Sequence, residues 1–255
     1  MNQLWADFVR YAARQSKVGS MRASVGLEAA WVNSTLPFCN GTFLTAAPAD
    51  AADLVRQLEA AKADAAPHAL PWALFTYDPH FENLAIPAES GFARVMGVRV
   101  MTADIARLAA PRRPLPALDF RRVTDDTGAR HALDLNMQAY GMPSEMTESV
   151  LATGAFFGDP SREFGFVGYA NGTPVSTASA VLIDGWLYVA LVATMPGHQK
   201  NGYAEAVMRH ALQQAAKATN VTRTSLDATD AGAPLYAQMG YTETGETWGM
   251  WMLAH

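Results

Sequence analysis

Residues 189–212, VALVATMPGHQKNGYAEAVMRHAL, constrain the fold of this chain more than any other stretch. Residues 186–194 are almost uninterruptedly apolar, as in a strand covered on both faces, so we expect a strand that is central in its sheet. Pro196 and Gly197 end that strand, and after Gly202 the apolar residues recur with the period of one helical face. The stretch predicts a strand, a tight loop and an amphipathic helix.

The predicted loop is suited to binding a phosphate group. Backbone N–H groups at a helix start have no intrahelical acceptor and lie at the positive end of the helix dipole, and Gly202 lets a ligand approach the main chain. A Walker A loop would begin similarly, with Gly197 and Gly202, but Tyr203-Ala204 stand where Lys-Ser/Thr is required. No G-x-G-x-x-G occurs either, so neither a nucleotide hydrolase nor a dinucleotide oxidoreductase is favoured.

The same loop carries a specific resemblance to a known family. The segment Val192-Ala193-Thr194-x-Pro196-x-x-Gln199-x-x-Gly202-Tyr203-Ala204 resembles the acetyl-CoA signature of the GNAT superfamily of N-acetyltransferases, whose loop pattern is Q/R-x-x-G-x-G/A. The resemblance covers residues 118–255 and implies an α/β fold with a mixed sheet, with acetyl-CoA as cosubstrate. It also implies two groups of cofactor contacts: main-chain pairing of the pantetheine with Val192, Ala193 and Thr194, and pyrophosphate binding by Gln199 and the backbone of Lys200, Asn201, Gly202, Tyr203 and Ala204.

A tyrosine further along the chain is the predicted catalytic acid. Residues 233–241, APLYAQMGY, resemble the A-x-x-L-Y-E-K-x-G-F segment of the family, which implies that the hydroxyl of Tyr236 protonates the departing coenzyme A thiolate. A phenol with a pKa of about 10 suits a thiolate of similar basicity. The alternative is a packed tyrosine with only its hydroxyl exposed. Asp230 lies where the family often has an Asn near the cofactor, which implies a weak cofactor contact.

The general base remains open at this point. An amine acceptor is protonated near neutral pH and must lose a proton before it attacks. Glu145, Asp184, His198 and Asp227 are the candidates, although His198 stands beside the loop, where it is equally suited to contact a phosphate. The six histidines show no spacing typical of metal ligands, so we expect no metal.

The remaining chain alternates between helical and strand patterns. An amphipathic helix with mixed charges is predicted over residues 1–17, which favours packing onto the domain over membrane binding. Asn171-Gly172 is a strong hairpin signal. Two short strands are predicted within residues 27–44, with others at 71–77, 91–101, 118–123, 164–169, 175–182, 222–226 and 248–253, and helices at 50–63, 127–139, 145–157 and 233–238.

Three prolines within residues 111–116 cannot sit inside regular structure and mark a linker. We therefore predict a first domain at residues 1–110, a linker at 111–117 and a catalytic domain at 118–255. The linker residues Arg112 and Arg113 are expected to be solvated, with contact to an anion as the less favoured alternative.

The first half is predicted to be a partial, degenerate copy of the GNAT unit, with an unrelated capping domain as the alternative. Gly91-Phe92 followed by Met101-Thr102-Ala103 echoes Gly240-Tyr241 followed by Met252-Leu253-Ala254. Residues 45–48, TAAP, lack the Q-x-x-G-x-A pattern. We therefore expect one cofactor site per chain, in either a homodimer or a monomer with pseudo-dimeric halves.

Composition argues against several other partners. The formal net charge of −5 gives no basic surface for nucleic acid. No apolar run reaches the ~18 residues of a membrane span, and the N-terminus does not read as a signal peptide. The single cysteine, Cys39, cannot form an internal disulfide, which predicts an inert, partly buried thiol in a cytoplasmic protein.

The combined prediction is an N-acetyltransferase that moves an acetyl group from acetyl-CoA to a primary amine of a small acceptor, by direct attack in a ternary complex. A non-catalytic acyl-CoA-binding module with the same fold is the alternative. Met142, Met146, Phe156 and Phe157 fall where the family usually has its substrate wall, although such stripes are more often core.

Overall fold

The computed structural model describes residues 4–81 and 85–254 of the chain. In these residues all strands join one mixed sheet, in the order β1-β2-β3-β4-β11-β5-β10-β9-β8-β7-β6. The elements, apart from short 3-10 turns, are α1 (Leu4–Gln15), β1 (Ser20–Ser24), β2 (Leu27–Trp31), β3 (Asn40–Leu44), α2 (Ala51–Ala65), β4 (Ala73–Tyr77), β5 (Phe92–Asp104), β6 (Asp119–Arg122), α3 (Asp126–Ala139), α4 (Glu145–Thr153), β7 (Glu163–Ala170), β8 (Thr173–Ile183), β9 (Trp186–Thr194), α5 (Tyr203–Thr219), β10 (Arg223–Ala228), α6 (Ala233–Met239) and β11 (Thr242–Leu253).

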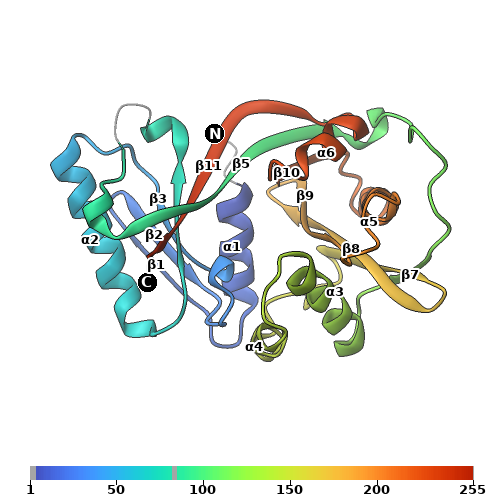
Figure 1. Cartoon of the computed structure of the whole chain (residues 1–255), viewed down its shortest axis with the longest axis horizontal. Coiled ribbons are helices and arrows are strands. Elements are labelled where there is room, and N and C mark those ends of the chain that lie inside the picture. Colours follow the sequence, from blue (N-terminus) through green and yellow to red (C-terminus); the bar gives the residue numbers. More distant parts are fainter. Residues whose placement is uncertain (1–3, 82–84, 255) are drawn as a thin grey trace.

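The two halves of the chain repeat one pattern of strand pairing, and they meet in the middle of the sheet at β11 and β5. In the first half β3 and β4 are parallel neighbours, and in the second half β9 and β10 are parallel neighbours. The last strand of each half is exchanged: β11 pairs with β4, β5 pairs with β10, and β5 and β11 pair with each other. Figure 1 shows β5 and β11 running together from one half to the other. The predicted α/β fold with a mixed sheet and a GNAT-like first half is confirmed. The exchange of strands between the halves was not predicted from the sequence.

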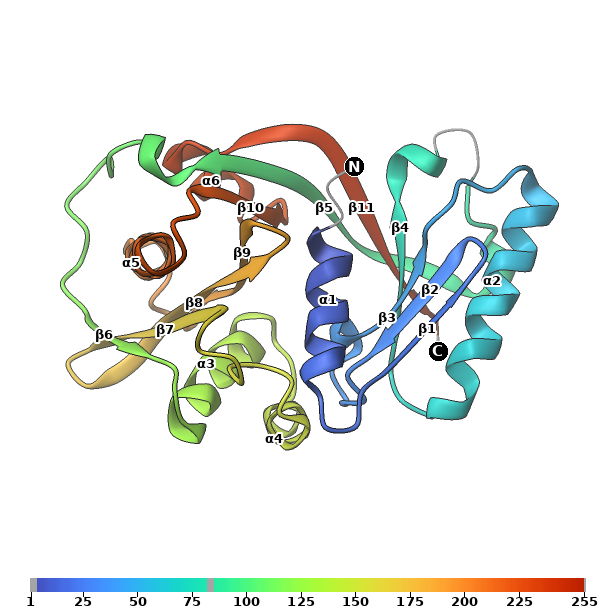
Figure 2. The same ribbon diagram turned by 180° about the vertical axis from the view of Figure 1, so that it is seen from behind.

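The helices cover the sheet on both faces and bring the halves together. In the second half α5 and α3 lie on opposite faces of β8 and β9, while in the first half α1 and α2 lie on opposite faces (Figures 1 and 2). Helix α1 stands between the halves, where its Leu4 and Tyr11 pack against Tyr188 of β9. The Tyr11 hydroxyl donates a hydrogen bond of 2.6 Å to Glu163 at the start of β7. The two halves therefore share buried contacts as well as strands.

Local sequence signals set several of the element boundaries. Asp50 caps α2 by accepting a hydrogen bond from the backbone N–H of Asp53, 2.7 Å away. Asn171 and Gly172 have φ values of 50° and 80°, as in the tight turn that their sequence predicts. The prediction that the helix after Glu145 reaches residue 157 is wrong: α4 ends at Thr153, because Gly154 takes a left-handed conformation with φ of 67°.

Three strands differ from the sequence prediction. Strand β1 was not predicted, since all five of its residues are exposed and it has no apolar face. Strands β5 and β11 are longer than predicted, because the extra residues pair the two halves with each other. Strand β9 lies inside the sheet between β10 and β8, as expected. No helix in residues 4–81 or 85–254 is long and apolar enough to cross a membrane.

Candidate active site

Strands β9 and β10 separate from each other shortly after they begin to pair. They are in register only at Leu187 with Thr224 and at Tyr188 with Ser225. Strand β9 then continues to Thr194 and β10 to Ala228 without further pairing between them. The main chain of β9 beyond Tyr188 therefore has a free edge facing the gap, which is where an extended ligand can pair with it.

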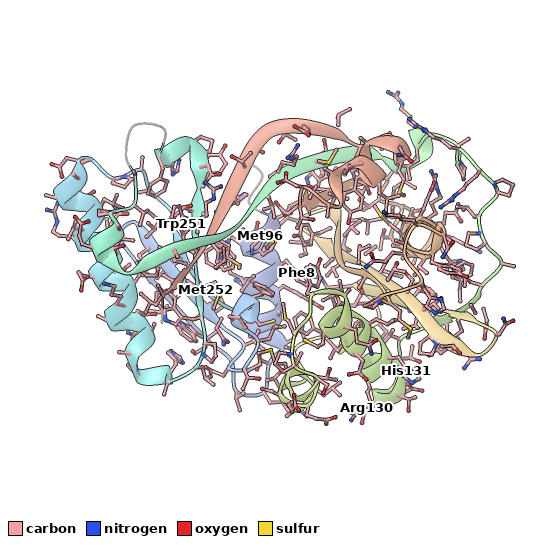
Figure 3. All side chains as sticks on the ribbon, viewed as in Figure 1. Phe8, Met96, Arg130, His131, Trp251 and Met252 are labelled. Atoms are coloured by element: carbon pink, nitrogen blue, oxygen red, sulfur yellow. The ribbon has the colours of Figure 1, made fainter. Side chains whose placement is uncertain are left out.

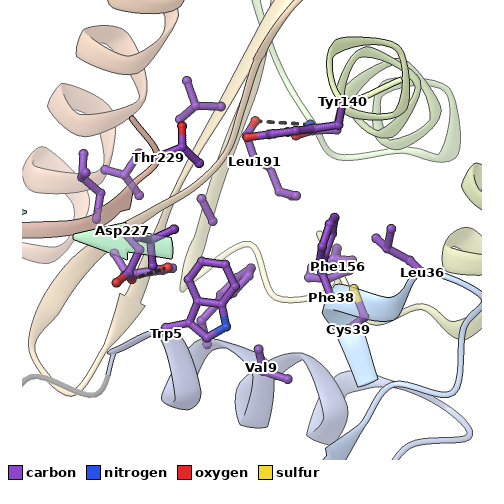
Figure 4. Close-up of a pocket in the computed structure, with 18 of the residues that line it drawn as sticks. Trp5, Val9, Leu36, Phe38, Cys39, Tyr140, Phe156, Leu191, Asp227 and Thr229 are labelled. Atoms are coloured by element: carbon purple, nitrogen blue, oxygen red, sulfur yellow. Dashed lines mark hydrogen bonds between the residues drawn. The ribbon is translucent and has the colours of Figure 1, made fainter. Parts of the chain in front are cut away.

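A bulge in β9 lies at this gap. Pairing between β8 and β9 shifts register between Thr177 and Ser179, where two residues of β9 oppose one residue of β8. Leu191 takes a left-handed conformation with φ of 53°, which is strained for a side chain of this size. The side-chain amide of Asn136, on α3, donates a hydrogen bond of 3.3 Å to the Leu191 carbonyl (dashed in Figure 4). Asn136 is buried, so it holds the bulge from inside the protein.

A cavity of about 180 Å³ opens beside the bulge. Residues 189–192 of β9 form one wall, and the ends of β10 and α6 contribute Asp227 and Tyr236. The first half closes the other side with residues from α1, the turn after residue 36, and β5 (Figure 4). Figure 3 shows Phe8 and Met96, two of these residues, in the middle of the molecule where the halves meet. The cavity is therefore built by both halves.

Asp227 is the one carboxyl group among the described residues of this wall. Its Oδ2 accepts a hydrogen bond of 2.8 Å from the Tyr188 hydroxyl, while no described residue bonds to the buried Oδ1. Burial raises the pKa of Asp227 to about 7, against the lowering effect of the Tyr188 hydrogen bond, and Glu246 raises it slightly further. At neutral pH this carboxyl can both accept and release a proton.

Tyr236 lies on the short helix α6, and its side chain lines the same cavity. Burial, with a smaller effect of Tyr140, raises the pKa of the Tyr236 hydroxyl above its ordinary value. The phenol therefore stays protonated over the whole range in which the protein works, as a proton donor must.

The loop before α5 presents unoccupied backbone donors. Among the described residues, none accepts a hydrogen bond from the backbone N–H groups of residues 199–204. Gly202, at the N-cap of α5, has φ of 82° and no side chain that could cap the helix. Lys200 also takes a left-handed conformation, with φ of 63°. The loop thus leaves the start of a 17-residue helix open to an anion.

The separated strands, the bulge and the uncapped helix start all lie in the second half of the chain, between residues 177 and 228. Residues 130–241 match the model of the Acetyltransferase (GNAT) family. This part of the chain is a GNAT domain. Acyl transfer from an acyl-CoA is the chemistry of that family, and Asp227, Tyr236 and the loop at residues 199–204 lie within the matched region.

Solved structures extend the likeness to the whole chain. A GCN5-related N-acetyltransferase from Kribbella flavida matches with a TM-score of 0.73 at 17% identity, over 99% of this chain and 95% of that one. A functionally unknown conserved protein from Staphylococcus epidermidis matches with 0.67 at 14% identity, over 93% and 95%. A tandem GNAT protein from the clavulanic acid biosynthesis pathway matches with 0.55 at 13% identity, over 98% and 93%. At such identities the likeness establishes the fold alone, and no curated protein matches the chain.

The linker preceding the GNAT domain reaches the open loop. It passes along the outer side of α5 (Figure 1), and Arg113 Nη2 donates a hydrogen bond of 2.5 Å to the Lys200 carbonyl. A Cβ atom added to Gly202 would lie 3.6 Å from the guanidinium of Arg113 and 3.4 Å from Pro116. Arg112 and Arg113 are both exposed, as expected of a solvated linker, and the guanidinium of Arg113 in addition contacts the loop. Its sequence neighbourhood gives no signal for this contact, because the two segments are 87 residues apart.

The other residues predicted for the GNAT site are divided between the cavity and the surface. Val192 lines the cavity, while Ala193 and Thr194 pair with β8 next to it. Asp230 does not line the cavity: its side chain is 89% exposed and forms an ion pair with Arg99 of β5. Of the four candidate bases, only Asp227 lies in the cavity wall, since Glu145 and Asp184 are exposed and His198 lies in the loop.

The predicted substrate wall is also divided. Met142 and Phe156 line the cavity, whereas Met146 and Phe157 do not and pack against the core cluster. Cys39 lines the cavity but is 6% exposed, and burial raises the pKa of its thiol to about 12, so it stays a neutral thiol as predicted. No cluster of metal-ligand side chains is present in the described residues.

The equivalent place in the first half is closed. Strands β3 and β4 stay in register over four residues, from Gly41 with Ala73 to Leu44 with Thr76. The start of α2 is occupied by carboxylates, because Asp50 accepts from the N–H of Asp53 and Asp53 accepts from the N–H of Ala49, 2.9 Å away. An anion would meet negative charge there instead of free donors.

Proposed function

We propose that this protein transfers the acetyl group of acetyl-CoA to a primary amine by direct attack in a ternary complex, without an acyl-enzyme. The observation that carries the proposal is the cavity between β9 and β10, where a carboxyl with a pKa of about 7 and a protonated phenol face one space. Acetyl as the acyl group and an amine as the acceptor follow from the GNAT resemblance of the loop and of the Tyr236 segment.

The coenzyme A part of the site follows the open edge and the open loop. The pantetheine arm would pair with the main chain of Val192, Ala193 and Thr194, where β9 has no partner on its β10 side. The pyrophosphate would accept hydrogen bonds from the backbone of Lys200, Asn201, Gly202, Tyr203 and Ala204, with Gln199 beside it. We keep Asp230 only as a peripheral contact, because it is already paired with Arg99.

The chemical step needs one base and one acid. Asp227 takes a proton from the acceptor amine, whose nitrogen then attacks the thioester carbonyl carbon. A backbone N–H at the bulge, near Val192, stabilises the negative charge that develops on the carbonyl oxygen. The carbon–sulfur bond breaks as the hydroxyl of Tyr236 gives its proton to the coenzyme A thiolate, and the second proton that the nitrogen loses on becoming an amide restores the phenol.

The test is release of free thiol from acetyl-CoA in the presence of a panel of primary amines. Tyr236→Phe should lower kcat by about 10²–10⁴-fold, the usual effect of removing a general acid, with little change in the KM for acetyl-CoA. Tyr241→Phe is the matched control, since Tyr241 lies next to Tyr236 but its hydroxyl bonds to Thr224, 3.0 Å away, and does not line the cavity.

Two results would contradict the proposal. Tight binding of acetyl-CoA without turnover of any amine would favour the non-catalytic module with the same fold. Full activity of Tyr236→Phe, at the level of the Tyr241→Phe control, would remove Tyr236 from the mechanism.

A further inference from the structure

We infer that the acceptor is an arylalkylamine: one amino group on a short alkyl chain that is attached to an aromatic ring, with no second charge. This inference rests on the proposed function and adds the class of substrate to it. It comes from the size of the cavity, the charge of its wall and the positions of its polar and aromatic residues.

The size of the cavity fits an acceptor body about as large as one six-membered ring. The cavity measures about 180 Å³. An apolar protein cavity of about 150 Å³ accepts benzene, so this one, which also has to receive the acetyl thioester beside residues 189–192, has room for an acceptor body of about one ring.

The charge of the wall excludes acceptors with a second charged group. Among the described lining residues, Asp227 is the one carboxyl, and there is no lysine, arginine or histidine. An amino acid would bring a carboxylate without a cation to pair it, and a diamine would bring a second ammonium without a second carboxylate. An unpaired charge in an apolar site costs several kcal/mol, so both are disfavoured.

The polar and aromatic groups lie at different ends of the cavity. Figure 4 shows Asp227 on one side, with Phe38 and Phe156 on the other side, toward Leu36 and Cys39. Phe8 extends this aromatic wall, with its ring centroid 5.8 Å from that of Phe156. An amine placed at Asp227 would therefore direct its body toward aromatic rings, which favour an aromatic ring in offset or edge contact.

The cavity is less suited to the long acyl chain of an acyl-CoA than to an amine acceptor. An acyl chain has no hydrogen-bond donor or positive charge that would pair with the carboxyl of Asp227. An ammonium group supplies both, and its proton can pass to that carboxyl. The one carboxyl among the described residues of the wall therefore favours the amine over the acyl chain.

The experiment compares kcat/KM for matched amines with acetyl-CoA as donor. We expect 2-phenylethylamine to exceed ethylamine by at least about tenfold, because the ring buries apolar surface. We expect it to exceed L-phenylalanine, which differs only by a carboxylate, by about a hundredfold or more, and butylamine to exceed 1,4-diaminobutane similarly. A preference for phenylalanine or for diaminobutane would overturn the inference while leaving the acetyltransferase proposal intact.

Calorimetry separates a failure of this inference from a failure of the proposed function. If no amine is acetylated, binding of 2-phenylethylamine to the protein with coenzyme A bound still tests the cavity. Binding that is at least tenfold tighter than that of ethylamine supports the acceptor class, although the transferase proposal then fails. Equal or absent binding of the two amines overturns the inference.

A pair of methionines supplies matched variants. Met142 lines the cavity and Met146 does not, yet both are partly buried and pack against the same core cluster. Met142→Trp should fill space and lower the ratio of kcat/KM for 2-phenylethylamine to that for ethylamine by about tenfold or more. Met146→Trp should leave the ratio of the two amines unchanged. If thermal melting shows that Met142→Trp is folded and the ratio of the two amines is nevertheless unchanged, the inference is overturned. A higher kcat/KM with hexanoyl-CoA than with acetyl-CoA as donor, measured in the wild type, would also overturn it.

Discussion

Burial raises the pKa of both Asp227 and Tyr236, with opposite consequences for their chemistry. The carboxyl of Asp227 moves from its usual acidic range to about 7, where it exchanges protons at neutral pH. The hydroxyl of Tyr236 moves further from neutrality and stays protonated. Burial therefore makes Asp227 a stronger base, and it keeps the phenol of Tyr236 protonated although it weakens that phenol as an acid, because an apolar cavity disfavours the charged form of each.

The first prediction concerns the pH profile of activity. The base must be deprotonated, so kcat/KM should rise with pH through about 7. Asp227→Asn should lower kcat/KM by about 10²–10⁴-fold and remove that inflection. Asp184→Asn is the control, since Asp184 is exposed in a hairpin turn with φ of 47°, which asparagine tolerates. An unchanged inflection in Asp227→Asn would assign it to another group.

The same substitution should change stability in the opposite direction from activity. Between pH ~4 and about 7 the folded protein keeps a proton on Asp227 that the unfolded chain has lost, so this group lowers stability as the pH rises. At pH 8 Asp227→Asn should therefore raise the free energy of unfolding by about 1–3 kcal/mol, and at pH 4 the gain should disappear. Urea denaturation at the two pH values measures this, and a gain of equal size at both would refute the assigned pKa.

The second prediction concerns Arg113, whose guanidinium lies at the loop that we assign to the pyrophosphate. Arg113→Gln should raise the KM for acetyl-CoA by about tenfold, the effect of one charge-assisted contact, with kcat nearly unchanged. Arg112→Gln is the matched control, because it removes the same charge from the adjacent linker residue. Equal effects of the two variants would show that the linker acts only through its net charge.

At the scale of elements, two helix starts in equivalent places differ in what occupies them. Helix α2 begins with two carboxylates: Asp50 accepts a hydrogen bond from the backbone N–H of Asp53 in the first turn, and Asp53 accepts one from the N–H of Ala49, just before the helix. Helix α5 begins with Gly202, which has no side chain and leaves the corresponding donors free. A phosphate is therefore attracted to α5 and repelled from α2.

The third prediction tests this difference. Gly202→Glu adds a side chain and a negative charge where we expect the pyrophosphate, so the affinity for acetyl-CoA should fall by about a hundredfold or more in calorimetry. Gly172→Glu is the control: Gly172 has a similar φ of 80° against 82° and open space around it, but lies in the hairpin turn between β7 and β8. Unchanged affinity in Gly202→Glu would refute the loop assignment.

At the scale of the whole molecule, the exchange of β5 and β11 makes each half depend on the other. Strand β4 of the first half pairs with β11, whereas β10 of the second half pairs with β5. If the partner strand from the other half were removed, the edge of β4 or of β10 would be bare, and bare edges tend to aggregate. The exchange also pairs, within one chain, the strands that a homodimer of single units would have to supply.

The fourth prediction follows from this dependence. The full chain should be a monomer of 27.4 kDa in light scattering and should unfold in a single thermal transition. Residues 118–255 expressed alone lack β5 and should be insoluble or show no cooperative transition. A well-folded, active fragment would show that the linker marks an independent domain boundary and that the strand exchange contributes little.

Much of this protein was determined by local sequence. The apolar strand, the glycine loop and the helix at residues 186–219 are set by periodicity and by backbone freedom at Gly202, and a short motif near Tyr236 indicated the acid. These features depend on residues that are close in sequence. For the same reason, the turn at Asn171-Gly172 could be predicted from its own sequence. The cap at Asp50 was not predicted, but it too depends only on neighbouring residues.

Tertiary structure alone decided the rest, because it depends on groups far apart in the chain. Asp227 stood out among four candidate bases only when burial beside Tyr188 raised its pKa. Arg113 reached the loop across 87 residues, and α1 and β5 came from the first half to close the cavity. Strand exchange has no local signal, since β5 and β11 would look like strands in either arrangement. The charge, the size and the accessibility of the site thus depend on how the two halves pack together. That packing joins residues that are far apart in sequence, so no short sequence pattern predicts it.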